Sequence, residues 1–427
     1  MPQSAAAAAH AVEVESGYTS ARMADRAAEV ERERPLESAA TVARPVRRSA
    51  GCTSLALAAL ASLILGAIAF VPALQNEFLY DDLPIIVENS SVIEPGPWYR
   101  FWLERYWPPG TSIDKLYRPL TIFSYRLNHV LAGGDTPDPW SFHLVNLVLH
   151  AVASAGVAIL AYRLTGRSAA AWIAGTLFAA HPLHTESVAT GYGRAELLAG
   201  VFGVWLLARH VRTGGDEPPR RARFYFFSAL LYLAAVMSKE HALFLWPAVL
   251  LIDVWPRRSR SAPGADELNG AAPKPGLIQR WRRAINESLG PRHVGYALAT
   301  AVFFLLRFRL FKWAYVVEPE RVRFWEAPMR HATPIQHLLT PFRLLWTTAE
   351  LLVYPPRLCP LWSIPALPLA DRLAPDVLAG IAILIVLLVL TLRCWRRGHL
   401  EGALIMGMLI VLAIPLQALP VANWYYA

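Results

Sequence analysis

Two adjacent carboxylates, Asp81 and Asp82, stand in the stretch NEFLYDDLPIIVENS, which covers residues 76–90. Acids occur between positions 75 and 94, but no Lys or Arg does. A carboxylate beside a hydroxyl group can take its proton during attack on carbon, so the pair is a candidate general base. The two acids need not share a task, because one can act as base while the other binds a metal, orients a backbone group or raises the pKa of its neighbour. On residue types alone, an ordinary loop turn is the alternative.

A second polar group lies in HPLHTESVATGYGRAELL, a hairpin between two apolar stretches. Its ionisable residues are His181, His184, Glu186, Arg194 and Glu196. Polar groups at membrane depth are costly and usually mark a site, although a solvated loop is the alternative. Pro182 is expected to end the incoming helix, and Gly191 and Gly193 are expected to loosen the connection. Two His three positions apart are weak evidence for a metal without a third ligand.

Basic residues that could meet a phosphate occur in two further motifs. In MSKEHAL, Lys239 and Glu240 interrupt an apolar run from 224 to 256. A cation there could bind a phosphate through charge-assisted hydrogen bonds, or the motif could be a short external turn with an internal ion pair. In KLYRPLTIFSYRLNHVLAG, the spacing of Arg118, Arg126 and His129 places them on one face of a helix. Such a helix could lie on the membrane with its basic groups toward lipid headgroups.

The elements that must position these residues are membrane helices. Residues 53–74, TSLALAALASLILGAIAFVPAL, contain no charge. A bilayer is crossed by about 20 apolar residues, whereas a cleaved signal peptide is shorter and closer to the N-terminus. Further apolar stretches follow, and 55% of all residues are hydrophobic while 17% are charged. The sequence therefore predicts an all-α, polytopic transmembrane helical bundle and excludes a soluble core.

Composition also limits the partners. The net charge of +9 is typical of basic cytoplasmic loops in a membrane protein, so no nucleic acid partner is expected. The three Cys are far apart and show neither metal-ligand spacing nor a disulfide framework. Residues 1–50 contain few large apolar side chains and are expected to be a disordered cytoplasmic tail, and residues 51–427 form the transmembrane domain.

The spans and their orientation follow from apolar runs and from basic residues. After the first span, we expect spans near 143–163, 169–182, 195–209, 224–238, 241–256, 294–311, 374–392 and 401–418, within a total of about nine to eleven. Arginines precede the first span and acids follow it, which predicts a cytoplasmic N-terminus and a large first external loop, 75–142. The basic loop after 209 and a linker, 257–292, should be cytoplasmic. Residues 336–354 are expected to be a re-entrant or interfacial amphipathic helix on the outer side.

Several motifs occur in an order that resembles a known family. They are DD, YRPL…RLNH, HLVNLVLHA, HPLHTE, GRAELL and SKEHAL, within about residues 70–365. They resemble the membrane half of the transmembrane and tetratricopeptide repeat O-mannosyltransferases and their bacterial relatives, which belong to the GT-C superfamily of glycosyltransferases. YPPRLCPLWS resembles a later external motif, except that PLWS replaces a usual acidic DYS-like stretch. No 34-residue repeat is detectable up to VANWYYA, so we expect a partial chain or a form without the repeats.

The resemblance implies a GT-C-like fold and transfer of a sugar, with inversion, from a polyprenyl-phosphate donor to an acceptor hydroxyl. The acceptor would be a protein Ser or Thr, with a lipid or a glycan as the alternative. Asp81, or next Asp82, would be the base. Donor phosphate and substrate would be bound by Arg118, Arg126, His129, His181, His184, Glu186, Arg194, Glu196, Lys239 and Glu240.

The expected location is a bacterial inner membrane with the active site facing outward. No cofactor is assigned, and a requirement for a divalent cation is left open. A transporter is the main alternative function, although transporters commonly place their sites near the midplane. A lipid-binding scaffold without catalysis is the other alternative.

Overall fold

The computed structural model describes residues 46–108, 116–211, 222–255, 290–311, 332–355 and 367–413, together with 329, 358 and 416. Several sequence expectations lie outside these residues: the tail up to residue 45, the basic loop 212–221, the linker 257–289, most of YPPRLCPLWS, and VANWYYA. The chain forms two units, Met1–Leu57 and Ala58–Ala427. The first residues of α2 belong to the first unit, and the pocket described below belongs to the second.

The described residues form helices and turns, and none of them forms a strand. The longer helices are α2 (Val46–Ala69), α5 (Pro139–Thr165), α6 (Ser168–Ala180), α8 (Arg194–His210), α9 (Ala222–Ser238), α10 (Leu245–Val254), α13 (Pro291–Phe311), α14 (Pro334–Val353), α15 (Pro375–Arg397) and α16 (Glu401–Leu412). Among the described residues, four segments are long and apolar enough to cross a bilayer: Cys52–Gln75, Pro139–Thr165, His293–Phe311 and Pro375–Arg397. This confirms the all-α polytopic membrane class, while the total of nine to eleven spans stays a prediction.

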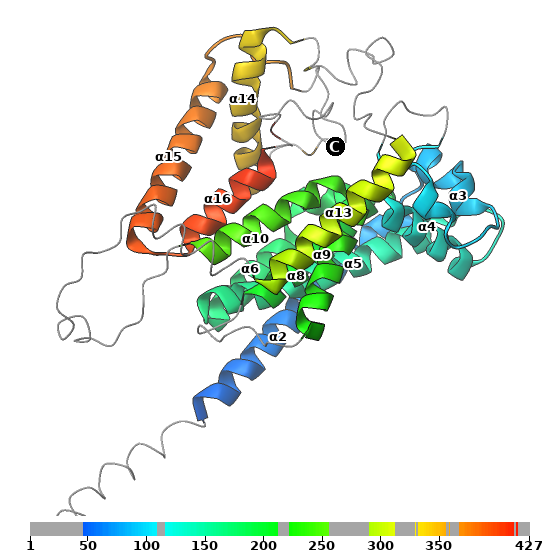
Figure 1. Ribbon diagram of the computed structural model, residues 1–427, viewed down its shortest axis with the longest axis horizontal. Coiled ribbons are helices and arrows are strands. Elements are labelled where there is room, and N and C mark those ends of the chain that lie inside the picture. The colour runs from blue at the N-terminus through cyan, green and yellow to red at the C-terminus, as the bar shows by residue number, and fades with distance from the viewer. Residues whose placement is uncertain are drawn as a thin grey trace, which may run out of the picture. The chain divides into compact units, whose positions relative to one another are not determined.

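The helices pack as neighbours along the chain and through small residues. Helix α5 lies against α6 and α8, α8 against α9, and α9 against α13, while α10 lies against α16 (Figure 1). A β-carbon added at Gly175 of α6 would lie 2.2 Å from Oγ of Ser62 in α2, so only glycine allows this approach. Membrane helices associate in this way because small residues bring their backbones together.

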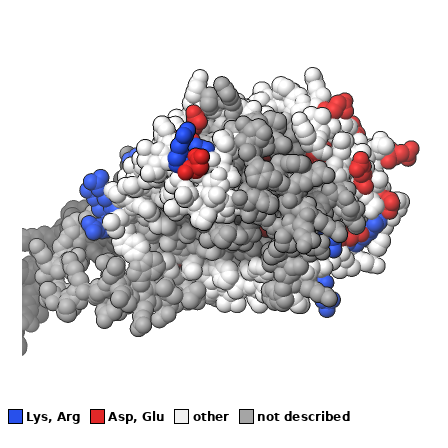
Figure 2. Space-filling model, turned by 90° about the horizontal axis from the view of Figure 1, so that it is seen from above, with Lys and Arg blue, Asp and Glu red and all other residues white. Residues whose placement is uncertain are grey.

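The described part of residues 75–142, called the first loop below, is a layer of short helices with its own core, and its external placement stays a prediction. It contains helical turns at Leu83–Val87, Ser90–Ile93 (α3) and Arg100–Leu103, followed by α4 (Pro119–Ala132). The side chain of Asn89 caps α3 by accepting a hydrogen bond from Ser91 N at 3.0 Å. The buried core of this layer consists of Ile85, Ile86, Val92, Phe101, Tyr106, Ile122, Tyr125 and Phe142. On the face shown in Figure 2, acidic side chains gather at the end where Figure 1 places α3 and α4.

The orientation of α4 differs from the expectation that its basic residues face lipid headgroups. Arg118 and His129 are only 8% and 6% exposed, whereas Leu131 is 76% exposed and Leu127 and Val130 are also exposed. The helix therefore turns its basic side inward and an apolar side outward. The physical reason is that a carboxylate on a later turn pairs with Arg118.

Helix α14 corresponds to the amphipathic segment expected at 336–354. A capping box fixes its start, because the side chain of Thr333 accepts from Gln336 N while the Gln336 side chain accepts from Thr333 N. Arg343 donates from Nε to Asp376 of α15 at 2.6 Å, and the two helices run side by side (Figure 1). The re-entrant or interfacial placement of α14 stays a prediction.

Candidate active site

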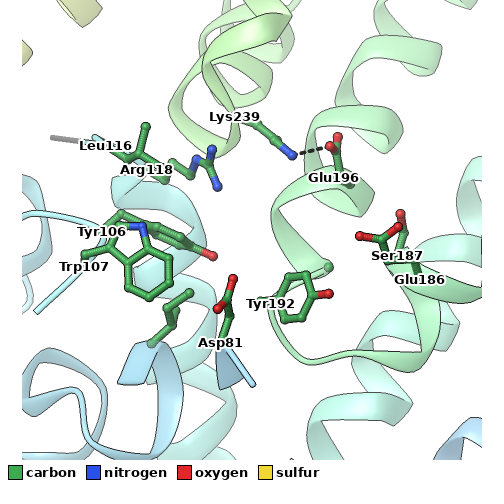
Figure 3. Close-up of a pocket in the computed structure, with 12 residues that line it drawn as sticks. Asp81, Tyr106, Trp107, Leu116, Arg118, Glu186, Ser187, Tyr192, Glu196 and Lys239 are labelled. Carbon is green, nitrogen blue, oxygen red and sulfur yellow. Dashed lines mark hydrogen bonds and ion pairs between the residues drawn. The ribbon is translucent and has the colours of Figure 1, made fainter. Parts of the chain in front are cut away.

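A pocket brings together residues from the first loop, the hairpin after α6 and the turn after α9 (Figure 3). Five of the candidate residues line it: Asp81, Arg118, Glu186, Glu196 and Lys239. They come from positions as far apart in the sequence as 81 and 239, so only the folded chain makes them neighbours. Acids and cations thus face one small space beside apolar helices.

The two adjacent aspartates occupy different environments. Asp81 faces the pocket, and its carboxylate has no hydrogen-bond partner among the residues that the structure describes. Burial raises its pKa, and the charge of Asp82 adds to this. Asp82 is 1% exposed, and its two oxygens accept hydrogen bonds from Tyr192 N at 2.6 Å and Leu79 N at 3.2 Å. The carboxylate of Asp81 is therefore open to the pocket, whereas Asp82 holds the hairpin.

Two cations line the pocket, and each is paired with a carboxylate. Arg118 Nε lies 3.0 Å from Oε2 of Glu240, and Lys239 forms an ion pair with Glu196 (Figure 3). Burial by itself would raise the pKa of Glu240, but the charge and hydrogen bond of Arg118, a backbone hydrogen bond and the charge of Lys239 together lower it. The guanidinium also lies 4.7 Å from the ring centre of Tyr106. These contacts hold both cations in place before any substrate arrives.

Glu186 adds a second acid on the opposite side of the pocket. It lies on α7 (Thr185–Ala189), a single helical turn inside the hairpin. Burial raises its pKa to about 7, an effect that Lys239 opposes and Glu196 reinforces. Near neutral pH this carboxyl is therefore divided between its charged and its protonated form.

The two glycines of the hairpin allow close packing and do not loosen the connection. A β-carbon at Gly193 would lie 2.3 Å from the carbonyl oxygen of Ser187. One at Gly191 would lie 2.8 Å from Oδ1 of Asp82. The tight turn between these glycines presents the backbone N–H of Tyr192 to Asp82, which corrects the expectation of a loosened connection.

Arg194 does not line the pocket, contrary to the expectation that it meets the donor phosphate. It is 0% exposed. Its Nε donates to Asn146 Oδ1 at 2.8 Å, and its Nη2 donates to Asn128 Oδ1 at 2.8 Å and to the carbonyl of Phe142 at 2.7 Å. Its Nη1 lies 3.4 Å from the carbonyl of Ser124. The guanidinium thus joins α4 and α5 to the start of α8, where the hairpin ends.

Arg126 and His129 are also directed away from the pocket. Arg126 Nη1 donates to the carbonyl of Val92 at 2.9 Å. His129 is buried in α4, and its Nδ1 has no hydrogen-bond partner within the described part of the chain. Neither residue lines the pocket, because α4 presents only its N-terminal Arg118 there.

The histidine pair lies on a different side of the hairpin. The Nε2 of His181 is 3.0 Å from the carbonyl of Leu352 in α14, which links the hairpin to that helix. The ring of His184 lies 4.3 Å from the ring of Phe178. Burial, followed by the nearby His150 and His181, lowers the pKa of His184 to about 4, so this side chain is neutral at pH 7. Both rings pack against protein outside the pocket lining.

Sequence reasoning missed the aromatic part of the pocket. Tyr106, Trp107 and Tyr192 line it together with Leu116 and Ile85. A signal was present for Tyr192, since it stands between two glycines in TGYGRAELL. Tyr106 and Trp107 carried no such signal, because aromatic residues are frequent throughout this chain.

A metal requirement is not decided by these residues. Within the described ranges, no group of three or more His, Cys, Asp or Glu side chains is arranged to hold a metal ion. The divalent cation left open above remains so.

The fold and the pocket define a polytopic helical membrane protein with a charged pocket formed by its first loop, the hairpin after α6 and the turn after α9. The chain is 37% identical over 195 residues to Protein O-mannosyl-transferase Tmtc2 of Drosophila melanogaster, a match covering 43% of this chain and 20% of that protein. It is 35% identical over 207 residues to TMTC2 of Homo sapiens, covering 47% and 24% of the two chains. It is 27% identical over 300 residues to TMTC3 of Mus musculus, covering 69% and 31%.

These similarities confirm the predicted resemblance to the transmembrane and tetratricopeptide repeat O-mannosyltransferases, here over about half of the chain. The matched region covers only 20%, 24% and 31% of the three relatives. No family model matches the chain. No solved structure matches it.

Proposed function

We propose that this protein is a membrane glycosyltransferase that moves a sugar from a polyprenyl-phosphate donor to a protein Ser or Thr hydroxyl. Mannose is the first sugar to test, since the similar proteins are named O-mannosyl-transferases. The observation that carries the proposal is the pocket itself, where the unpartnered carboxylate of Asp81 faces Arg118 and Lys239 (Figure 3). The proposed location is a bacterial inner membrane with the pocket on the outer face, because arginines precede the first span and acids follow it.

In this mechanism Asp81 takes the proton of the acceptor hydroxyl as its oxygen bonds to the anomeric carbon. The bond between that carbon and the donor phosphate oxygen breaks at the same time, and the phosphate leaves with its electron pair. Arg118 and Lys239 stabilise the negative charge that develops on the phosphate, and they need no reorganisation because the protein already holds them. Attack from the side opposite the phosphate inverts the anomeric centre.

The test is sugar transfer by the purified full-length protein, with radiolabelled polyprenyl-phosphate sugars and Ser/Thr peptides. Asp81→Asn keeps the size of the side chain but removes the base, so turnover should fall by roughly two to four powers of ten. Donor binding should change little. Asp82→Asn should reduce turnover less, because it loses one acceptor for the hairpin backbone. A larger loss in Asp82→Asn would move the base to that residue, and full activity in both variants and in the double variant would refute the mechanism.

A further inference from the structure

The acids around the pocket differ in whether their carboxyl groups contact a protein partner. The carboxylates of Asp82, Glu196 and Glu240 each accept hydrogen bonds or form ion pairs. In contrast, the carboxyl groups of Asp81 and Glu186 have no hydrogen-bond or ion-pair partner within the described ranges. Two acids on opposite walls are therefore available to a substrate, and the mechanism above uses only one of them.

The position of Glu186 relative to the other groups indicates what it would meet. In Figure 3, Glu186 and Ser187 lie together, with Tyr192 between them and Asp81, while Arg118 and Lys239 occupy another side. During transfer the sugar is bonded to the phosphate on the cations and to the acceptor oxygen beside Asp81. The sugar ring must then occupy the space between them, and Glu186, Ser187 and Tyr192 line that same pocket.

The chemistry of this wall suits sugar hydroxyls better than a phosphate. A hydroxyl group both donates and accepts, so it can bond a carboxyl group in either protonation state and also the Ser187 hydroxyl. A charged carboxylate would repel a phosphate, and the raised pKa of Glu186, about 7, already shows that its charged form is disfavoured here.

We propose that Glu186, with Ser187 beside it, binds hydroxyl groups of the transferred sugar and so selects which sugar the enzyme accepts. This inference rests on the proposed function. Loss of a hydroxyl from the donor leaves a polar group of the site unpaired, which is how hydrogen-bonding sites discriminate between substrates.

The test compares polyprenyl-phosphate mannose with its 2-, 3-, 4- and 6-deoxy analogues, using the purified full-length protein. For wild type, at least one deoxy analogue should have a kcat/KM roughly 10- to 100-fold below that of the parent, the range of one hydrogen bond to a charged group. Glu186→Ala should lower kcat/KM for the parent by a similar factor. For the deoxy analogue that wild type discriminates against, Glu186→Ala should lower kcat/KM little further. The ratio of kcat/KM between the parent sugar and this analogue should therefore approach one. Glu186→Gln should restore part of the discrimination.

The matched control is Glu88→Ala, which removes an exposed acid outside the pocket and should leave discrimination unchanged. Thermal unfolding in detergent checks that each variant is folded. If Glu186→Ala is not folded, the comparison uses Glu186→Gln in its place. If wild type transfers sugar but Glu186 variants lower kcat/KM equally for the parent and all analogues, the hydroxyl assignment is overturned and the proposed function stands. If wild type transfers no sugar from any polyprenyl phosphate, both fail.

Discussion

Arg118 and Glu240 lie 122 positions apart in the sequence, yet Arg118 Nε is 3.0 Å from Glu240 Oε2. This ion pair ties the start of α4 to the turn after α9, and Glu240 also accepts from Tyr117 N at 3.2 Å. A guanidinium carries five N–H donors, so one carboxylate partner does not exhaust them. The pair can therefore orient Arg118 and still leave it able to bind a phosphate.

We expect Arg118→Ala and Lys239→Ala each to weaken use of the lipid-phosphate donor. A lost charge-assisted contact costs about 1.5–3 kcal/mol, which should appear as a rise in the donor KM of roughly 10- to 150-fold. A donor titration under steady-state conditions measures this. Arg126→Ala is the matched control, because it removes the same charge from a side chain that bonds the carbonyl of Val92 outside the pocket. An equal effect of all three substitutions would indicate general electrostatics instead of specific contacts.

We expect Arg194→Ala to lower the stability of the fold and not to remove a direct contact with the donor. The substitution removes the donor to Asn146 Oδ1, Asn128 Oδ1 and the Phe142 carbonyl, and leaves these buried acceptors unpaired. Breaking a buried charged network costs about 3–5 kcal/mol. Thermal unfolding without any donor present should therefore show a lowered Tm, and Arg194→Lys should recover only part of the loss. A variant with the wild-type Tm and a raised donor KM would return Arg194 to a role in phosphate binding.

Glu186 should make stability depend on pH. Its pKa is raised from 4.5 to about 7, so the folded protein holds this proton more tightly than the unfolded chain does. Its contribution to stability is then fully present below pH 4.5 and is lost as the pH rises to about 7. Because Glu186→Gln cannot titrate, the Tm of wild type should fall relative to this variant across that window, by roughly 3–4 °C for a chain of this size.

Thermal unfolding of wild type and of Glu186→Gln between pH 4 and 8 measures this difference in Tm. The neighbouring charges, Lys239 and Glu196, are the same in both proteins. Glu88→Gln changes an exposed acid and should run parallel to wild type. Parallel curves for Glu186→Gln as well would contradict a raised pKa at this position.

The orientation in the membrane can be tested by cysteine labelling. In a background without the three native Cys, Asp135→Cys lies in an exposed turn of the first loop, and Arg397→Cys lies at the end of α15. We expect an impermeant maleimide to label position 135 in intact cells, and position 397 only after the membrane is opened. The opposite result would place the pocket on the cytoplasmic side.

The sequence by itself determined the class of this protein. Uncharged runs such as 53–74 have no stable place except a bilayer or a deep core, and helices satisfy their own backbone groups in either environment. The run expected at 143–163 is helical from Pro139 to Thr165, and Asp138 caps it by accepting from Ser141 N at 3.0 Å. The ordered motifs were also sufficient for the resemblance that the similar proteins confirm.

Only the tertiary structure decided which charged residues share the pocket. Spacing along α4 placed Arg118, Arg126 and His129 on one face. It could not show that Arg118 pairs with Glu240, that Arg126 bonds the carbonyl of Val92 in α3, or that His129 is buried away from the pocket. Likewise, the sequence does not distinguish the adjacent carboxylates Asp81 and Asp82. In the fold, the backbone N–H of Tyr192 donates to Asp82 and not to Asp81, which gives the two side chains different environments. Partners more than a hundred residues apart are chosen by the packing of helices, and local periodicity carries no information about them.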